Sequence, residues 1–162
     1  MSNRLVSTVL GALGLAPKSA TGHYPNGEPT VEPLRLTDDE WRDRLEPLQY
    51  AILRQHGTEG AGSSPLNREA RHGAFHCAGC DLPLFGSETK FESGTGWPSF
   101  FDPLPGVVAT RTDFGLILPR TEYHCARCDG HQGHVFNDGP KPTGKRYCNN
   151  GLALKFVAAA PA

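Results

Sequence analysis

The spacing of apolar and polar positions changes along the chain near Gly73, and the first part has helical features. Thr37 to Glu40 form a capping box, in which the Thr37 hydroxyl caps the first turn and Glu40 reaches back. This pattern predicts a short helix that carries Trp41 and Leu45 on one face.

A second short helix is expected directly after the first. Pro47 fits its first turn, and its body runs from Leu48 to Gln55. Its expected buried residues are Tyr50, Ile52 and Leu53, and Gly57 is the expected stop.

After Gly73, short apolar or β-branched runs alternate with Gly, Pro or Asp. Such punctuation is typical of short antiparallel strands. The expected strands are Ala74–His76, Val107–Arg111, Leu116–Leu118, Glu122–His124, His134–Phe136 and Leu152–Phe156. The pattern predicts a mainly β domain with two short N-terminal helices.

The 162 residues suit one domain with a tail. We expect a leader or flexible segment over 1–36, the domain over 37–157 and a frayed end over 158–162. The first sixteen residues resemble a weak signal sequence, but polar residues dilute it and no clean cleavage site follows. The segment is also too short to span a bilayer. We expect a cytoplasmic protein, with export as the alternative.

Charge narrows the function classes. The chain has 16 basic and 17 acidic residues, a formal net charge of -1. A protein held mainly by phosphate contacts would normally show a basic excess. The near-neutral charge therefore predicts that the protein has no nucleic-acid partner. We also expect no membrane partner, and we expect a monomer.

Four of the five cysteines form two Cys-x-x-Cys pairs, Cys77 with Cys80 and Cys125 with Cys128. Two such turns facing each other give the tetrahedral sulfur coordination that zinc accepts in a closed, structural site. We expect a structural Zn²⁺ there. The alternatives are two disulfides or a redox pair.

The fifth cysteine, Cys148, has basic neighbours at Lys145 and Arg146. Positive charge lowers the pKa of a thiol toward the reactive thiolate. On a strand, Arg146, Cys148 and Asn150 would share one face. The alternative is a buried, inert cysteine.

Other candidate site residues lie elsewhere in the chain. His131 and His134 stand close together beyond the second Cys-x-x-Cys pair, and histidine is the usual proton donor near neutral pH. They could instead be a zinc ligand or surface residues. Trp97, in a glycine-rich aromatic loop, is expected to form a pocket wall or part of the core.

Several motifs stand together in one order along the chain. They are Gly57-Thr58-Glu59, the two Cys-x-x-Cys pairs, Lys90 to Phe100, Gly133-His134-Val135-Phe136, Asp138-Gly139-Pro140 and Arg146-Tyr147-Cys148. Together they resemble the peptide-methionine (R)-S-oxide reductases, the B-type methionine sulfoxide reductases, over residues from about 37 to 156. The resemblance implies two antiparallel sheets with short N-terminal helices, and the R epimer of methionine sulfoxide, mainly in proteins, as substrate.

The resemblance also implies catalytic roles. Cys148 matches the nucleophile that attacks the sulfoxide sulfur and becomes a sulfenic acid. His131 and His134 match the pair that helps to protonate the departing oxygen. Asn150 matches a residue that holds the substrate and the nucleophile in place.

Substrate contacts follow in the same way. Trp97 is similar to the indole that packs on the substrate methyl group. Arg146 is similar to the basic residue beside the nucleophile, and Asp138 to a residue that orients a histidine.

Three residues depart from the family pattern. Thr95 stands where many members carry a resolving cysteine, so we expect reduction by an external thiol such as thioredoxin, glutaredoxin or glutathione. Gln132 replaces the usual leucine between the histidines, and Gly151 the usual serine after Asn150.

Two rival functions have different requirements. A zinc-ribbon binding module would need a basic face and no reactive thiol. A Cys-His acyl hydrolase would need an oxyanion hole and would form an acyl-enzyme.

Overall fold

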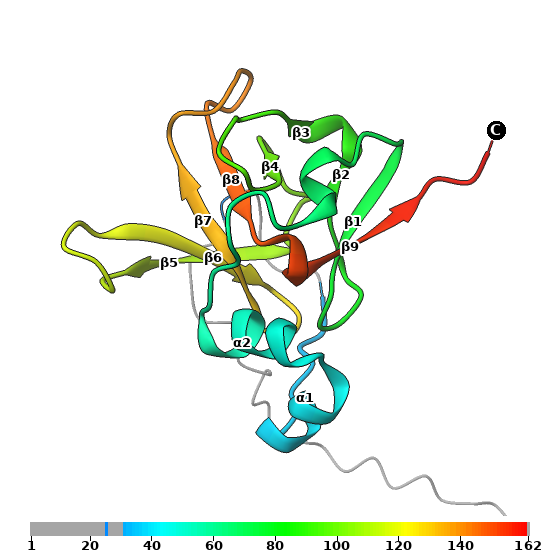
Figure 1. The fold of residues 1–162 in the computed structure, drawn as a ribbon, viewed down its shortest axis with the longest axis vertical. Helices are drawn as coiled ribbons and strands as arrows, with labels where there is room; N and C mark the ends of the chain where they lie inside the picture. Colours follow the sequence, from blue (N-terminus) through cyan, green and yellow to red (C-terminus); the bar gives the residue numbers. More distant parts are fainter. Residues whose placement is uncertain (1–24, 26–30, 162) are drawn as a thin grey trace, which may run out of the picture.

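Two short helices begin the main part of the chain that the computed structural model describes, namely residue 25 and residues 31–161 (Figure 1). Helix α1 spans Asp38–Arg44 and starts at the predicted capping box. The Glu40 amide donates to the Thr37 hydroxyl over 3.3 Å, and the Thr37 amide donates to the Glu40 carboxylate over 2.7 Å. Trp41 and Leu45 are buried, as predicted.

Helix α2 spans Pro47–Gln55 and buries the three predicted residues. It ends at Gln55, as predicted, but His56 and not Gly57 adopts the left-handed conformation after the last turn, with φ of 56°. The Gly57 amide donates to the Ala51 carbonyl over 3.0 Å. A Cβ at residue 57 would lie 2.9 Å from that oxygen, so the close approach requires glycine.

The described chain then forms two antiparallel sheets. The smaller has the order β2-β1-β9, and the larger has the order β3-β4-β8-β7-β6-β5. The strands are β1 (Gly73–Cys77), β2 (Pro83–Gly86), β3 (Lys90–Phe91), β4 (Ser99–Phe100), β5 (Val108–Asp113), β6 (Arg120–Cys125), β7 (His131–Phe136), β8 (Arg146–Asn149) and β9 (Leu154–Ala158). The short 3₁₀ helices are η1 (Pro65–Arg68), η2 (Ser87–Thr89) and η3 (Gly151–Ala153). The mainly β fold with two sheets and two helices is therefore confirmed.

Buried aromatic rings join the two sheets. Phe75 and Phe85 come from the smaller sheet, and Phe100, Tyr123 and Tyr147 from the larger one. Phe85 stacks on Phe100 with ring centroids 4.2 Å apart, and Phe75 meets Phe100 edge-on at 4.9 Å. This core fixes the larger sheet, whose other face carries the site described below.

One predicted strand is wrong. Leu116–Leu118 lies in the loop between β5 and β6, and its three side chains are exposed. An apolar run predicts a strand only if it is buried, and no strand of the described chain pairs with this one. The other predicted strands overlap β1, β5, β6, β7 and β9.

The segment before α1 packs on the body of the protein. The Leu34 amide donates to the Arg127 carbonyl over 2.7 Å, and Val31, Leu34 and Leu36 pack against the core. The expectation of a leader concerns residues that lie mostly outside the described part. Among the described residues, no helix is both long and apolar enough to cross a membrane.

Candidate active site and metal centre

The sheet register places Cys148 between two partner strands. Cys148 on β8 pairs with Ser99 on β4 and with His134 on β7. Directly opposed residues of antiparallel strands project to the same face of a sheet. The register therefore brings His134 beside the thiol, although 14 positions separate them in the sequence.

A bulge in β7 puts both histidines on that face. Glu122 on β6 pairs with His134, but His124 pairs with His131, so Gln132 is an extra residue with no partner in this ladder. Simple alternation would send residues 131 and 134 to opposite faces; one extra residue reverses this. The two imidazole centroids are 5.5 Å apart.

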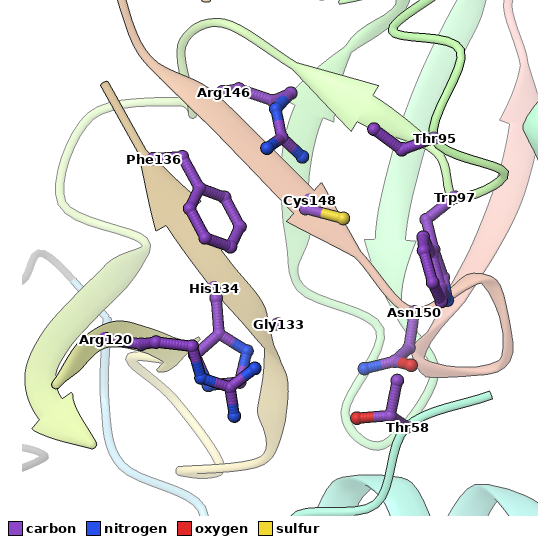
Figure 2. A pocket seen from close by; sticks show the side chains of 10 residues that line it. All are labelled: Thr58, Thr95, Trp97, Arg120, Gly133, His134, Phe136, Arg146, Cys148 and Asn150. Atoms are coloured by element: carbon purple, nitrogen blue, oxygen red, sulfur yellow. The ribbon is translucent and has the colours of Figure 1, made fainter. Parts of the chain in front are cut away.

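The thiol lies in a cavity of about 260 Å³. Phe136 and Trp97 stand on opposite sides of Cys148, so an apolar group can fit between two rings (Figure 2). The lining residues are Thr58, Thr95, Trp97, Arg120, Gly133, His134, Phe136, Arg146, Cys148 and Asn150. The structure thus brings together five of the seven predicted catalytic and substrate-binding residues.

His131 is not in this cavity but in an adjoining one of about 240 Å³, which shares Arg120 and His134 with the first. His131 is buried, and its Nδ1 lies 2.9 Å from Glu122 Oε1. His56 Nδ1 approaches the same oxygen at 3.2 Å. Burial raises the pKa of Glu122, but the hydrogen bond with His131 and the nearby positive charges prevail and lower it to about 2.

His134 also has a carboxylate partner. Its Nε2 lies 2.7 Å from Asp113 Oδ2. The Gly115 amide and then His134 lower the pKa of Asp113 to about 2, so this carboxylate is charged and accepts the hydrogen bond. Burial lowers the pKa of His134, which favours the neutral ring, with its proton on Nε2 and a free acceptor at Nδ1.

The pKa of Cys148 differs in direction from the prediction. Burial raises it, and this effect outweighs the opposing positive charge of Arg146 and the hydrogen bond from Thr95. The sequence showed the basic neighbour but not the partial burial of the thiol. The resting sulfur is therefore mainly protonated, and a nearby base has to accept its proton.

Asp138 binds a different partner from the expected histidine. Its two carboxylate oxygens accept hydrogen bonds from Arg146 Nε and Nη2 at 2.9 and 3.1 Å. The histidines are instead held by Asp113 and Glu122, which sequence reasoning missed. No short-range spacing links these carboxylates to the histidines, because the contacts cross strands.

Glu59 connects the pocket walls, a role that its place in a motif did not reveal. Its amide donates to Asn150 Oδ1 over 2.9 Å, and its carbonyl accepts from the Trp97 indole over 3.1 Å. Its buried carboxylate accepts from the Gly151 and Leu152 amides at the start of η3. Asn150 and Trp97 are therefore held in place before any substrate binds.

The other four cysteines form a separate, buried cluster. Cys77 Sγ lies 3.6 Å from Cys128 Sγ, and Cys80 Sγ lies 3.5 Å from Cys125 Sγ. These separations exceed the ~2.05 Å of a disulfide. They are close to the ~3.8 Å between sulfurs on a tetrahedral zinc with Zn–S bonds of ~2.3 Å. The donor set and its burial suit a closed, structural zinc site.

The core side of the β7 bulge connects this cluster to the strand that carries Cys148. Gln132 Nε2 donates to Cys77 Sγ over 3.3 Å, and Gln132 Oε1 accepts from Asn149 over 3.1 Å. The Gln132 carbonyl accepts from both the amide and the side chain of Asn150. Gln132 thus contacts both the four-cysteine cluster and the residues that follow Cys148.

The pocket has the parts that a thiol-dependent oxidoreductase uses: an accessible sulfur, a facing imidazole and an aromatic wall. The SelR domain family matches residues 45–158. With this match to most of the chain, the protein belongs to the SelR-domain family of peptide methionine sulfoxide reductases.

Curated relatives agree with this assignment. The chain is 54% identical over 122 residues to "Peptide methionine sulfoxide reductase B1, chloroplastic" of Oryza sativa subsp. japonica, covering 75% of this chain and 57% of that protein. It is 51% identical over 128 residues to "Peptide methionine sulfoxide reductase MsrB" of Agrobacterium fabrum, covering 78% and 95%. The chain thus spans less than two thirds of the plant relative and nearly all of the bacterial one. A crystal structure of the Mis18 "Yippee-like" domain aligns with 56% of the chain at 17% identity and a TM-score of 0.44, which carries no conclusion.

Proposed function

We propose that this protein reduces the R epimer of methionine sulfoxide, in proteins and peptides and as the free amino acid, to methionine. The observation that carries the proposal is the position of Cys148, which faces His134 in a cavity between Trp97 and Phe136. An aromatic wall suits the methyl group beside the sulfur, and the thiol suits attack on that sulfur.

The reaction balances with this chain's own groups. Cys148 Sγ attacks the sulfoxide sulfur and forms an S–S bond with it. The oxygen then bonds to Cys148 Sγ as the S–S bond and the sulfoxide S–O bond break, so that methionine leaves and Cys148 becomes a sulfenic acid. The sulfoxide sulfur gains two electrons, and the cysteine sulfur loses two. The thiol proton ends on the transferred oxygen, so this step needs no external proton.

His134 is the proposed carrier of that proton. With its Nε2 proton held toward Asp113, its Nδ1 can accept the thiol proton as the sulfur attacks and then pass it to the sulfoxide oxygen. Arg146 and the Thr95 hydroxyl stabilise the developing thiolate. His131 lies in the adjoining cavity. If His131 gains a proton, the Glu122 carboxylate balances its charge.

Regeneration of Cys148 needs two thiols from outside the chain. Thr95 contacts Cys148, in the position where a resolving cysteine would have to stand. The other four sulfurs are buried in their own cluster. Two equivalents of thiol, from thioredoxin, glutaredoxin or a small thiol, would reduce the sulfenic acid to the thiol, with release of water and one disulfide.

Separated R and S methionine sulfoxide peptides, with dithiothreitol as reductant, test the reaction. We expect methionine from the R peptide only, and none from the Cys148→Ser variant. Trapping with dimedone after one turnover without reductant should label Cys148 alone. Equal reduction of both epimers, or activity in the variant, would reject the proposal.

We further propose that the four-cysteine cluster holds one Zn²⁺, which stabilises the fold without contacting substrate. All four sulfurs are needed for the ion, so no position stays open for chemistry. Metal analysis of the purified protein should give one zinc per chain. Another metal, or none in a folded protein, would contradict this assignment.

A reducing compartment such as the cytoplasm is the proposed location, because none of the five cysteines forms a disulfide. We also propose that the protein is a monomer. Cell fractionation and sedimentation velocity would test these two points.

A further inference from the structure

The loop between β5 and β6 exposes an apolar surface that the proposed chemistry does not use. We define the apolar tip as Phe114, Leu116, Ile117 and Leu118, whose exposed fractions are 76, 60, 100 and 76%. These are four of the six large hydrophobic side chains that are strongly exposed in the described chain. Residues 114–119 contain no charged side chain. Contiguous exposed apolar groups of this kind mark interaction sites.

The base of this loop is part of the active site. Asp113 and Arg120 flank the loop and form an ion pair with Arg120 Nη2 and Asp113 Oδ2 3.0 Å apart. Asp113 holds His134, and Arg120 lines the cavity of Cys148. Figure 2 shows Arg120 beside His134 in this cavity, and Figure 1 shows the loop extending away from the body. The loop that carries the apolar tip therefore begins and ends at residues of the active site.

We infer that the apolar tip binds apolar residues that flank methionine sulfoxide in an unfolded segment of a substrate protein. An extended peptide advances ~3.3–3.6 Å per residue, so neighbours two or three positions away lie roughly 7–11 Å from the sulfoxide, beyond the pocket rim. Methionine is mostly buried among apolar residues, and its oxidation disrupts such cores. The inference rests on the proposed function and specifies its substrate class.

A double variant, Ile117→Ser with Leu118→Ser, removes two of the four apolar side chains of the tip, including the fully exposed Ile117. Leu48→Ser is the matched control, since Leu48 is 68% exposed on α2 and away from the loop. Three R-sulfoxide substrates are compared: N-acetyl-methionine sulfoxide amide, a peptide with Leu, Ile and Phe flanks, and one of equal length with Gly and Ser flanks.

We expect the double variant to raise KM for the apolar peptide about tenfold and to change the other two substrates less than about twofold. The control should change none of them. An equal effect on all three substrates, or no effect on the apolar peptide, would overturn the inference. A wild-type dimer that the variant converts to a monomer in sedimentation velocity would also overturn it, because the tip would then bind a second copy. If the wild type reduces no substrate at all, the proposed function itself fails.

Discussion

The four-cysteine cluster and the Cys148 pocket use the same side chain in opposite surroundings. In the cluster, four buried sulfurs face one another at 3.5 to 3.6 Å within two pairs, closed from solvent by the core. In the pocket, one partly buried sulfur faces Thr95, Arg146 and a cavity. In the first arrangement the sulfurs are buried and lie close to one another, whereas in the second one sulfur remains available to a substrate.

The difference extends to the groups around the sulfurs. α1 and α2 pack beside the cluster, and Trp41 and Leu53 share one buried hydrophobic core with its cysteines. Arg54 donates to the Cys128 carbonyl, and its guanidinium lies 4.6 Å from the centre of the Trp41 ring. The pocket is instead bordered by hydrogen-bonded pairs of titratable side chains, such as Asp113 with His134. Apolar enclosure suits a part that stabilises the fold, and pairs that move protons suit a part that reacts.

Replacing one cysteine of each region by serine should give the largest difference in zinc content, stability and activity. Cys125→Ser removes one of four ligands, so we expect loss of zinc and of most of the free energy of unfolding, several kcal/mol. Cys148→Ser should leave zinc content unchanged and the free energy of unfolding within about 1 kcal/mol, while activity falls at least about a thousandfold. Metal analysis, urea denaturation and methionine formation measure these effects. A folded, zinc-free Cys125→Ser protein with full activity would show that the four-cysteine cluster has no structural role.

The next largest effect concerns the base that faces Cys148. His134→Gln should lower kcat by a factor of roughly 10²–10⁴, the usual contribution of a positioned acid or base, with zinc retained. Asp113→Asn should give a smaller loss, because the ring stays but its preferred tautomer is lost. Steady-state kinetics with the R-sulfoxide peptide measures both. A loss smaller in His134→Gln than in Asp113→Asn would show that His134 is not the proton carrier.

Much of the fold could be predicted from local signals. The capping box at Thr37 satisfies backbone groups within one helical turn, so its sequence determines the start of α1. The Cys-x-x-Cys spacing likewise identified the cluster, since each pair lies on one tight turn. Leu116–Leu118 misled because an apolar run says nothing about whether a partner strand covers it.

The site was less predictable because its geometry depends on strand register. The bulge at Gln132 places His131 and His134 on the same face of the sheet, and no local sequence pattern predicts this bulge. The carboxylates Asp113 and Glu122 reach the histidines across strands, 21 and 9 positions away. The pKa of Cys148 depends on how deeply the thiol is buried, which the adjacent residues in the sequence do not indicate.

The third prediction, of intermediate size, concerns how the free energy of unfolding depends on Glu122 and on pH. Glu122 balances His131 and Arg111, so Glu122→Gln should cost about 1–3 kcal/mol of unfolding free energy at about pH 7. Its folded pKa of about 2 lies below its usual 4.5. The stabilisation by Glu122 is therefore fully present above the usual value and is lost as the pH falls through about 2. Urea midpoints of both proteins should converge below about pH 3, whereas a constant gap would show that the charge is not responsible.

The smallest effect concerns Gln132, which contacts both regions. Gln132→Leu removes the side-chain bonds to Cys77 Sγ and Asn149, but the backbone carbonyl that holds Asn150 remains. We expect zinc affinity to fall about tenfold, as for other groups that hold metal ligands, and the unfolding free energy to fall by about 1 kcal/mol. Turnover at saturating zinc should stay within about twofold.

Asn150→Ala is the converse variant. It removes the side-chain hydrogen bonds to the Glu59 amide and to the Gln132 carbonyl but no contact of the cluster, so turnover should fall while zinc affinity is retained. Chelator competition and kinetics on the two variants together locate the boundary between the regions. If Gln132→Leu lowers turnover as strongly as Asn150→Ala, the cluster and the pocket are one coupled unit, and the separation of structural from reactive cysteines holds for the sulfurs alone.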